Sequence, residues 1–542
     1  MRCIAGLIVF TAMVIASSLE WVVAIGGGKA GTWELLLNNA GVVAMHMTLT
    51  HHNTVIIFDQ TEAGPSGLPC TAASSDKADC WVHSIEYDIA TNTFRPLTLH
   101  TDTWCSSGSF LSDGTLLQTG GNGSGSRRIR KFQPCSDKQC NWVELEDQYL
   151  SAERWYASNQ ALPEKDRAIV IGGQYNQSYE FVPKSNPDEG VFDLPFLKDT
   201  KGDNLYPFIQ LSSDGNLFIF ANRDSILFDY KRNKVIRKFP KLPGTGARNY
   251  PSTGSSVMLP LDHADGFRRV EVMVCGGGVN GSYREARKNK VFRVGQSTCG
   301  RMVITDEEPK WAMEKMPQPR LMNDMILLPT GHVLVINGAS RGSAGWELAT
   351  SPLTKPFLYK PDAIAGRRFS SAKGTAIARM YHSSAILLPD GRILVAGSNP
   401  HAHYRFTGVS FPTELRVQAY TPYYMDPFFD DRRAMNLTID AGAGVVYRER
   451  FGIEFWMGRR PGVMEFHAYA PPFATHSTSM NQRMLKLECA SLVREMSGFV
   501  RAMLVAPPSP IVAPSGYYLL SVVNGGFPSK AQWVRFIHGS NA

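Results

Sequence analysis

A thiol, phenols and an imidazole recur at one position of a repeated sequence pattern. Cys105, Tyr156, Tyr206 and His382 each stand six residues before the end of an apolar segment that leads into a turn, and Tyr381 directly precedes His382. Imidazole nitrogen and phenolate oxygen are suitable donors for a tetragonal Cu(II) centre. If the repeated units stand around one axis, equivalent positions meet near that axis although they are far apart in sequence.

Aromatic residues also recur at such positions for a simpler reason, because they pack between sheets. We predict only this packing role for Tyr206 and Tyr250. For Tyr156, Tyr381 and His382 the sequence pattern alone leaves both interpretations open.

The repeat predicts the elements that position these side chains. An apolar strand, a turn of Asp-Gly type, a second apolar strand and then often Gly-Gly recur in seven copies about 50 to 60 residues apart, as in FLSDGTLLQTGG at 110–121 and ILLPDGRILVAGS at 386–398. A second hairpin follows, as in HSIEYDIATNTFRPL at 83–97. Two hairpins make a four-stranded blade, and a period near 50 is typical of kelch repeats. We therefore predict an all-β fold with a seven-bladed kelch-type β-propeller.

The pattern divides the chain into three parts. Residues 1–24 are predicted to be a signal peptide, because Arg2 precedes the apolar run 4–16 and small residues follow. Residues 25–428 are assigned to the propeller, whose strand at 413–424 joins the N-terminal strands and closes the ring. Residues 429–542 alternate like strands without the repeat, which predicts an immunoglobulin-like β-sandwich. No run is long enough to span a bilayer.

Composition excludes several classes of function. The net charge of +8 is spread along the chain without a basic cluster, so we expect no nucleic-acid partner. The G-x-S-x-G, H-E-x-x-H and Walker A patterns are absent from the sequence, which removes the signatures of serine hydrolases, zincins and nucleotidases.

Features of exported proteins agree with the signal peptide. Candidate glycosylation sites are Asn122, Asn176, Asn280 and Asn436. Among the nine cysteines, Cys70 with Cys80 and Cys135 with Cys140 are predicted to form disulfide bonds. Cys275, Cys299 and Cys489 stay unassigned, and Cys275 is a candidate buried free thiol.

Four motifs in order resemble the galactose oxidase and glyoxal oxidase family of copper radical oxidases, and the chain looks most like plant glyoxal oxidase-like proteins. They are TDTWCSSG with Cys105, ERWYAS with Tyr156, ARMYHSSAILLPDG with Tyr381 and His382, and PPFATHSTSMNQRMLKL with His476. The resemblance implies one copper ion per chain, held by both tyrosines and both histidines. It also implies a Cys-Tyr cofactor, in which Cys105 forms a thioether bond with Tyr156, the radical site. Tyr381 would be the axial ligand and proton acceptor.

The family's tryptophan over the cross-linked tyrosine is replaced here by IGGQY, which makes Tyr175 the candidate that shields the radical. The signal peptide predicts secretion, to the apoplast or cell wall if the source is a plant, and we expect a monomer. The resemblance implies an enzyme. It would convert small aldehydes of the glyoxal or methylglyoxal type to carboxylic acids and reduce dioxygen to hydrogen peroxide. Two alternatives stay open: a galactose-type alcohol oxidase acting on cell-wall sugars, and a non-catalytic kelch propeller that binds glycan or protein.

Overall fold

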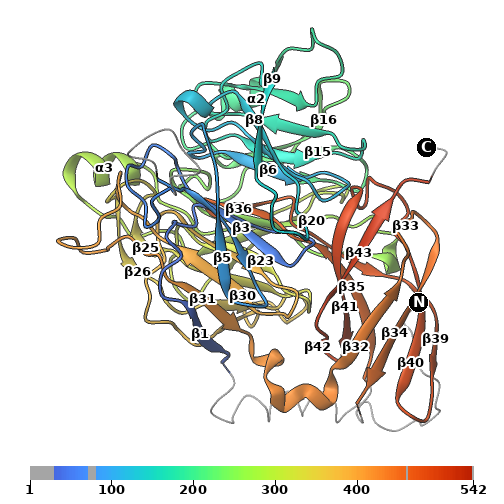
Figure 1. Ribbon diagram of the computed structural model, residues 1–542. Coiled ribbons are helices and arrows are strands. Elements are labelled where there is room, and N and C mark those ends of the chain that lie inside the picture. The colour runs from blue at the N-terminus through green and yellow to red at the C-terminus, as the bar shows by residue number, and fades with distance from the viewer. Residues whose placement is uncertain (1–29, 71–80, 459–461, 540–542) are drawn as a thin grey trace.

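Seven four-stranded antiparallel units follow one another along the chain and form a β-propeller (Figure 1). The computed structural model describes residues 30–70, 81–458 and 462–539. Each hairpin of the sequence repeat supplies the two inner strands of a blade, and the hairpin after it supplies outer strands. The predicted seven-bladed propeller is therefore confirmed.

The blades have the following strands. Blade 1 contains β2 (His46–Leu49), β3 (Thr54–Phe58), β4 (Ser84–Asp88) and β5 (Thr93–Leu97); blade 2 contains β6 (Ser107–Phe110), β7 (Leu116–Thr119), β8 (Arg128–Phe132) and β9 (Trp142–Tyr149); blade 3 contains β10 (Ser158–Ala161), β11 (Ala168–Ile171), β12 (Ser178–Val182) and β13 (Phe192–Asp193). Blade 4 contains β14 (Phe208–Leu211), β15 (Leu217–Ala221), β16 (Asp224–Asp229) and β17 (Lys234–Lys238); blade 5 contains β18 (Ser255–Met258), β20 (Glu271–Cys275), β21 (Thr298–Val303) and β22 (Ala312–Lys315). Blade 6 contains β23 (Asp324–Leu327), β24 (Val333–Ile336), β27 (Phe357–Tyr359) and β28 (Phe369–Ser371); blade 7 contains β29 (Ser383–Leu387), β30 (Ile393–Gly397), β31 (Val417–Thr421) and β1 (Thr32–Leu37).

The second strand of each blade is buried on both faces, because a blade packs between two neighbours. This explains why β3, β15, β24 and β30 read as nearly continuous apolar runs rather than as alternating strands. The turn before such a strand uses glycine at positive φ, as at Gly114 and Gly391. The Asp before each glycine accepts a hydrogen bond from the backbone two residues later, which fixes the turn.

The ring closes between the two ends of the propeller segment. Strand β1 pairs antiparallel with β31, so blade 7 combines the first described strand with the last propeller strand. The predicted closure by the strand near 413–424 is confirmed. Closure removes an open sheet edge that would otherwise be free to pair with another chain.

Five buried arginines hold the blades together at their ends. Arg130, Arg154, Arg248, Arg320 and Arg379 are among the largest fully buried side chains. Each donates to a backbone carbonyl group at or just after the end of an inner strand, for example Arg154 to Gly172 at 2.8 Å and Arg379 to Gly397 at 2.7 Å. These bonds satisfy carbonyl groups where the chain leaves the sheet.

A β-sandwich follows the propeller, as predicted. One sheet has the order β32 (Ala434–Asp440), β34 (Arg450–Met457), β40 (Phe499–Val505) and β39 (Cys489–Arg494). The other has β38 (Arg483–Leu487), β35 (Met464–Ala470), β41 (Gly516–Asn524), β43 (Gln532–Ile537) and β33 (Val445–Val446), with β42 (Phe527–Pro528) beside β41. Its strands lie together at one side of the propeller in Figure 1. Strand β19 (Leu261–Asp262) of blade 5 extends the second sheet by pairing with β38, which ties the two parts together.

The helices in the ranges that the structure describes are few and short. They are α2 (Pro195–Asp199), α3 (Ser282–Asn289) and the 3₁₀ turns η1 (Gly123–Gly125), η2 (His263–Asp265), η3 (Tyr423–Met425) and η4 (Pro427–Arg432). None of the helices in the described ranges has the length and apolar character of a membrane span.

The disulfide predictions have different outcomes. Cys135 is bonded to Cys140, as predicted. Cys275 is bonded to Cys299 across the paired strands β20 and β21, so the prediction of a free thiol at Cys275 is wrong. The register decides this pairing, because it sets the two residues opposite each other. Cys80 lies outside the described residues, so its bond with Cys70 stays a prediction.

The features of export are described only in part. Residues 1–24, the predicted signal peptide, lie outside the described residues. Asn280 and Asn436 are exposed, and Asn122 is partly exposed. The Asn176 amide donates a hydrogen bond of 2.6 Å to the carbonyl oxygen of Glu153, which a glycan at that nitrogen would disturb.

Candidate metal centre

The repeat position that carries the reactive side chains has an unusual backbone. Six blades have a non-glycine residue at positive φ just before the innermost strand: Cys105 (53°), Tyr156 (64°), Tyr206 (49°), Thr253 (50°), Met322 (56°) and His382 (60°). A left-handed conformation costs such residues roughly 1–2 kcal/mol, so the surrounding blade must enforce it. The repeat therefore imposes one local geometry, and the residue type decides what chemistry it presents.

A hairpin from the sandwich side enters the propeller channel. Strands β36 (Phe473–Thr475) and β37 (Thr478–Met480) form this hairpin, and β36 pairs with the inner strand β2. Strand β37 contacts the inner strands of blades 2 to 6. His476 and Ser477 form its two-residue turn at φ 45° and 66°. Positive φ at both positions defines a type I′ turn, which normally takes Asn-Gly.

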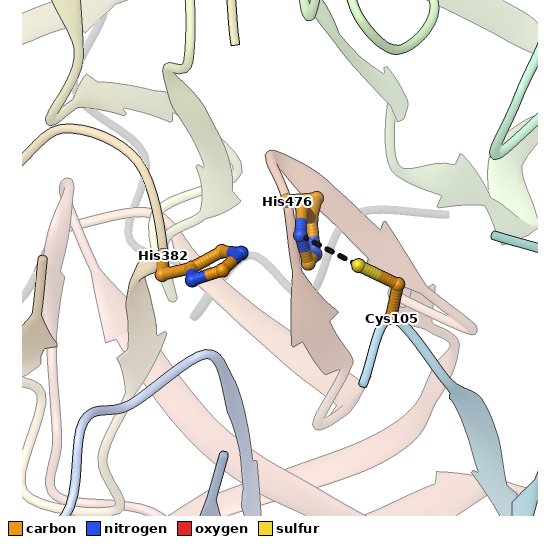
Figure 2. A group of neighbouring side chains, drawn as sticks. All are labelled: Cys105, His382 and His476. Atoms are coloured by element: carbon orange, nitrogen blue, oxygen red, sulfur yellow. Dashed lines mark hydrogen bonds between the residues drawn. The ribbon is translucent and has the colours of Figure 1, made fainter. Parts of the chain in front are cut away.

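Three buried side chains meet where the hairpin turn reaches the repeat positions. The candidate ligand atoms of Cys105, His382 and His476 lie within 4.8 Å of one another. Figure 2 shows them pointing toward one another from three separate segments, with His476 at the tip of the hairpin. Nε2 of His476 lies 3.2 Å from Sγ of Cys105, while Nδ1 lies 2.7 Å from the hydroxyl of Thr475. Neither ring nitrogen of His382 has a hydrogen-bond partner among the described residues.

Three tyrosines complete the cluster. The hydroxyl of Tyr250 lies 3.1 Å from that of Tyr156 and 2.9 Å from that of Tyr381. The ring of Tyr250 also stacks on Tyr156 with centroids 4.5 Å apart. The prediction that Tyr250 only packs is therefore wrong. It was missed because it stands three residues before Thr253, the repeat position of blade 5.

Tyr206 behaves closer to its predicted packing role. Its hydroxyl donates to the carbonyl oxygen of Ser106 at 3.0 Å, and its ring lies 5.2 Å from that of His476. It thus supports the hairpin tip without joining the chain of hydroxyl groups.

Burial keeps these groups neutral when no cation is present. It raises the pKa of Tyr156 and Tyr381 well above 10 and lowers the pKa of His382 and His476 well below 6.5. Burial likewise raises the pKa of the Cys105 thiol, while the nearby Tyr156 hydroxyl acts in the opposite direction. A bound cation would reverse this balance for the phenols by stabilising phenolate.

This donor set fits a copper ion. The buried imidazole of His382, whose two nitrogen atoms find no partner in the part of the chain that the structure describes, is costly unless something binds it. Imidazole and phenolate donors suit Cu(II). The fold thus brings together Cys105, Tyr156, Tyr381, His382 and His476, the residues that the sequence motifs single out.

Tyr175, the residue expected to shield the radical on Tyr156, does not lie over the Tyr156 ring. Its side chain is 76% exposed, which is a poor position from which to cover the buried Tyr156 ring. Trp155 lies there instead, with its ring centroid 4.7 Å from that of Tyr156. The sequence does contain this tryptophan directly before Tyr156, in the ERWYAS motif, and that position could have identified it as the covering residue.

Comparisons with known proteins agree with both parts of the fold. The family model described as glyoxal oxidase N-terminus matches residues 45–424, and the model described as galactose oxidase-like, Early set domain, matches residues 435–536.

Two plant relatives are similar over nearly the whole chain. An aldehyde oxidase GLOX of Vitis pseudoreticulata is 45% identical over 522 residues, covering 94% of this chain and 97% of the relative. The aldehyde oxidase GLOX1 of Arabidopsis thaliana is 40% identical over 526 residues, covering 94% of this chain and 85% of the relative. A solved fungal alcohol oxidase in complex with copper superposes with a TM-score of 0.70 at 18% identity, covering 94% of this chain and 99% of the other, which shows a shared fold.

Proposed function

Because the chain belongs to the glyoxal oxidase family of copper radical oxidases, we propose that it oxidises small aldehydes to carboxylic acids and reduces dioxygen to hydrogen peroxide. The similarity to plant aldehyde oxidases over nearly the whole chain carries this proposal. Dialdehydes and ketoaldehydes of the glyoxal and methylglyoxal type are the proposed substrates.

His382, His476, Tyr156 and Tyr381 are the residues that would hold one copper ion. When bound, copper supplies one-electron redox chemistry, whereas oxidising an aldehyde hydrate to an acid removes two electrons. A second one-electron site is therefore needed, and Tyr156 is the proposed one. Its buried phenol is oxidised to a phenoxyl radical, which accepts the other electron.

Cys105 is proposed to tune that radical through a thioether bond with Tyr156. Forming the bond replaces the S–H of Cys105 and one ring C–H of Tyr156 by a C–S bond, and the two protons and two electrons that leave would reduce one dioxygen molecule to hydrogen peroxide. The backbone N–H of Tyr156 donates to the carbonyl oxygen of Cys105 at 3.0 Å, and both side chains are buried in one cluster. The sulfur donates electron density to the ring and thereby lowers its oxidation potential.

Tyr381 is proposed to accept the proton of the substrate. Its hydroxyl is linked through Tyr250 to that of Tyr156, so a proton taken up at Tyr381 can move along three hydroxyl oxygens without entering water. Burial of Tyr156 and Tyr381, each about 5% exposed or less, excludes bulk water from these oxygens. Positioned groups of this kind typically accelerate proton transfer by roughly 10²–10⁴-fold.

The protein is also proposed to be exported and to act as a monomer. The N-terminal apolar run after Arg2 and the exposed sequons at Asn280 and Asn436 support export. In a plant, the apoplast or cell wall would be its place of action.

Intact-protein mass and peroxide release test the proposal. Copper-loaded protein should lose two hydrogens relative to its sequence mass, and Cys105→Ser should not. Tyr156→Phe should abolish peroxide release from methylglyoxal while leaving thermal unfolding of the copper-free protein nearly unchanged. Tyr206→Phe is the matched control, because its hydroxyl donates to the carbonyl oxygen of Ser106 and lies outside the chain of hydroxyl groups from Tyr156 to Tyr381.

A separate comparison of substrates tests the assignment of aldehydes as the substrate class. Glyoxal, methylglyoxal and galactose should be compared in the same assay. Faster peroxide release from galactose than from both aldehydes would replace the aldehyde assignment by an alcohol oxidase. Unchanged peroxide release by Tyr156→Phe would refute the radical assignment.

A further inference from the structure

A line of tryptophans runs from Tyr156 to the protein surface. The ring of Trp155 lies 4.7 Å from that of Tyr156, Trp104 lies 4.9 Å from Trp155, and Trp346 stacks on Trp104 at 5.2 Å with an interplanar angle of 11°. Tyr156 is 5% exposed, whereas Trp346 is 40% exposed. Each ring in the series touches the next.

Three different parts of the propeller supply these rings. Trp104 precedes β6, Trp155 precedes β10, and Trp346 lies in the turn of an additional hairpin, β25 (Ala339–Gly342) and β26 (Ala349–Pro352), inserted between β24 and β27 of blade 6. This hairpin lies far from the outer sandwich strands in Figure 1. A dedicated insertion therefore carries the surface tryptophan to its place.

The turn that bears Trp346 is held on both sides. The backbone N–H of Ala344 donates to Pro251 at 2.9 Å, and that of Glu347 donates to Pro400 at 2.9 Å. The carboxylate of Glu347 also lies 2.9 Å from Nδ1 of the buried His401. These contacts fix the backbone of the turn, and stacking on Trp104 holds the indole ring of Trp346.

The chemistry of these rings suits electron transfer. Indole is among the side chains most easily oxidised by one electron, and tunnelling rates fall steeply with distance, so short hops between touching rings are much faster than one long step. The indole Nε1 atom of Trp104 is buried without a hydrogen-bond partner among the described residues. An oxidised Trp104 ring has no hydrogen-bonded base to take its proton, so it regains its electron from a neighbouring ring.

We propose that Trp346, Trp104 and Trp155 form an electron relay through which a one-electron oxidant at the surface generates the radical on Tyr156. The inference rests on the proposed function, since it takes Tyr156 as the redox-active residue. Each event removes one electron from the Tyr156 phenolate that a bound cation would stabilise and reduces one oxidant molecule by one electron, so no proton has to leave the buried site. Each tryptophan is oxidised and refilled in turn and is unchanged overall.

Stopped-flow oxidation of the copper-loaded protein tests the relay. Protein reduced at Tyr156 is mixed with hexachloroiridate(IV) without substrate, and the phenoxyl absorption is followed with time. Trp346→Phe and Trp104→Phe should each slow its appearance at least tenfold, because phenylalanine keeps a ring but is not oxidised by this reagent. Trp346→Tyr should recover part of the rate.

Trp456→Phe is the matched control, because Trp456 is 42% exposed but lies on β34 of the sandwich. Its rate should equal that of the wild type. Equal rates in wild type, Trp346→Phe and Trp104→Phe would overturn the relay and leave the proposed function standing. So would an unchanged oxidation rate in Trp346→Phe with a raised KM for methylglyoxal, which would make Trp346 a substrate contact. Absence of any Tyr156-dependent absorption in the wild type would overturn both.

Discussion

At the scale of single residues, the candidate metal centre is a set of buried donors that the protein leaves without sufficient partners. Neither ring nitrogen of His382 has a partner within residues 30–70, 81–458 and 462–539, and burial holds the pKa of both site histidines low. The phenols of Tyr156 and Tyr381 share one bridging hydroxyl, that of Tyr250. Burying these groups lowers the stability of the folded protein when no cation is bound, and a bound cation would compensate for that loss.

The bridging hydroxyl predicts a role for Tyr250 in turnover. Tyr250→Phe should lower kcat for methylglyoxal by roughly ten- to a hundredfold, because it breaks the path between Tyr156 and Tyr381 but keeps the stacked ring. Steady-state peroxide release across pH measures the effect. A kcat within twofold of wild type at every pH would show that this hydroxyl carries no proton.

A second residue-scale prediction concerns Asp324, at the start of β23. Burial raises its pKa to about 7, although a hydrogen bond of 2.8 Å from Asn337 acts in the opposite direction. A raised pKa means that the folded state binds the proton more tightly, so this contribution to stability is present below the unfolded pKa near 4 and is lost as pH rises to about 7.

Asp324→Asn should therefore gain stability relative to wild type as pH rises. Between pH 5 and pH 8 the difference in unfolding free energy should shift by about 3 kcal/mol in favour of the variant. Urea unfolding at the two pH values measures it. A difference that is the same at both values would contradict the raised pKa.

At the scale of elements, the same two structural features recur at the ends of the blades. A left-handed residue turns the chain into the innermost strand, and in several blades a buried arginine binds the carbonyl groups that leave the sheet. The same geometry presents a thiol in blade 2, a phenol in blade 3 and an imidazole in blade 7. The blade thus fixes the backbone conformation at this position, while the residue type that occupies it can change.

The contribution of a buried blade-end arginine to stability can be tested at Arg320, away from the candidate metal site. Arg320 is fully buried and donates to the carbonyl oxygens of Asn337 and Lys355 at 2.6 Å each. Arg320→Met should destabilise the fold by roughly 2–4 kcal/mol, because both carbonyl groups lose a charged donor in the interior. Chemical unfolding measures this loss.

Arg237 offers a matched comparison. It also donates to two carbonyl oxygens, those of Asp306 and Glu307, but at the surface. Arg237→Met should cost less than about 1 kcal/mol, because water replaces the lost donor. Equal losses in the two variants would show that burial of the bonds is not what matters.

At the scale of the whole molecule, the sandwich and the propeller exchange elements. Hairpin β36–β37 leaves the sandwich to line the propeller channel, and β19 leaves blade 5 to extend a sandwich sheet. Gln482, just after the hairpin, donates to Met325 at 3.0 Å and accepts from Leu327 at 2.8 Å, both on the inner strand β23. The candidate metal site thus contains residues of both parts.

Copper should consequently stabilise the molecule as a unit. Free copper at 100 times its Kd should add about 2.7 kcal/mol to the stability of the folded state, and chelation should lower Tm. In His476→Ala this chelation shift should shrink strongly, because the hairpin then offers no imidazole. In His52→Ala, which changes an exposed histidine, it should be unchanged. Thermal unfolding followed by fluorescence measures all three, and an undiminished shift in His476→Ala would remove that residue from the ligand set.

The repeat by itself determined the propeller, because alternating apolar segments and Asp-Gly turns are local signals that each blade obeys separately. The motifs around Cys105, Tyr156, Tyr381, His382 and His476 also stood out in the sequence, since each is a continuous string. Only the tertiary structure placed Tyr250 between two hydroxyl groups and Trp346 at the end of a line of rings. It also paired Cys275 with Cys299 and left Tyr175 exposed. These contacts join residues of different strands, blades and insertions, and no local pattern encodes which distant side chains will meet when the ring closes.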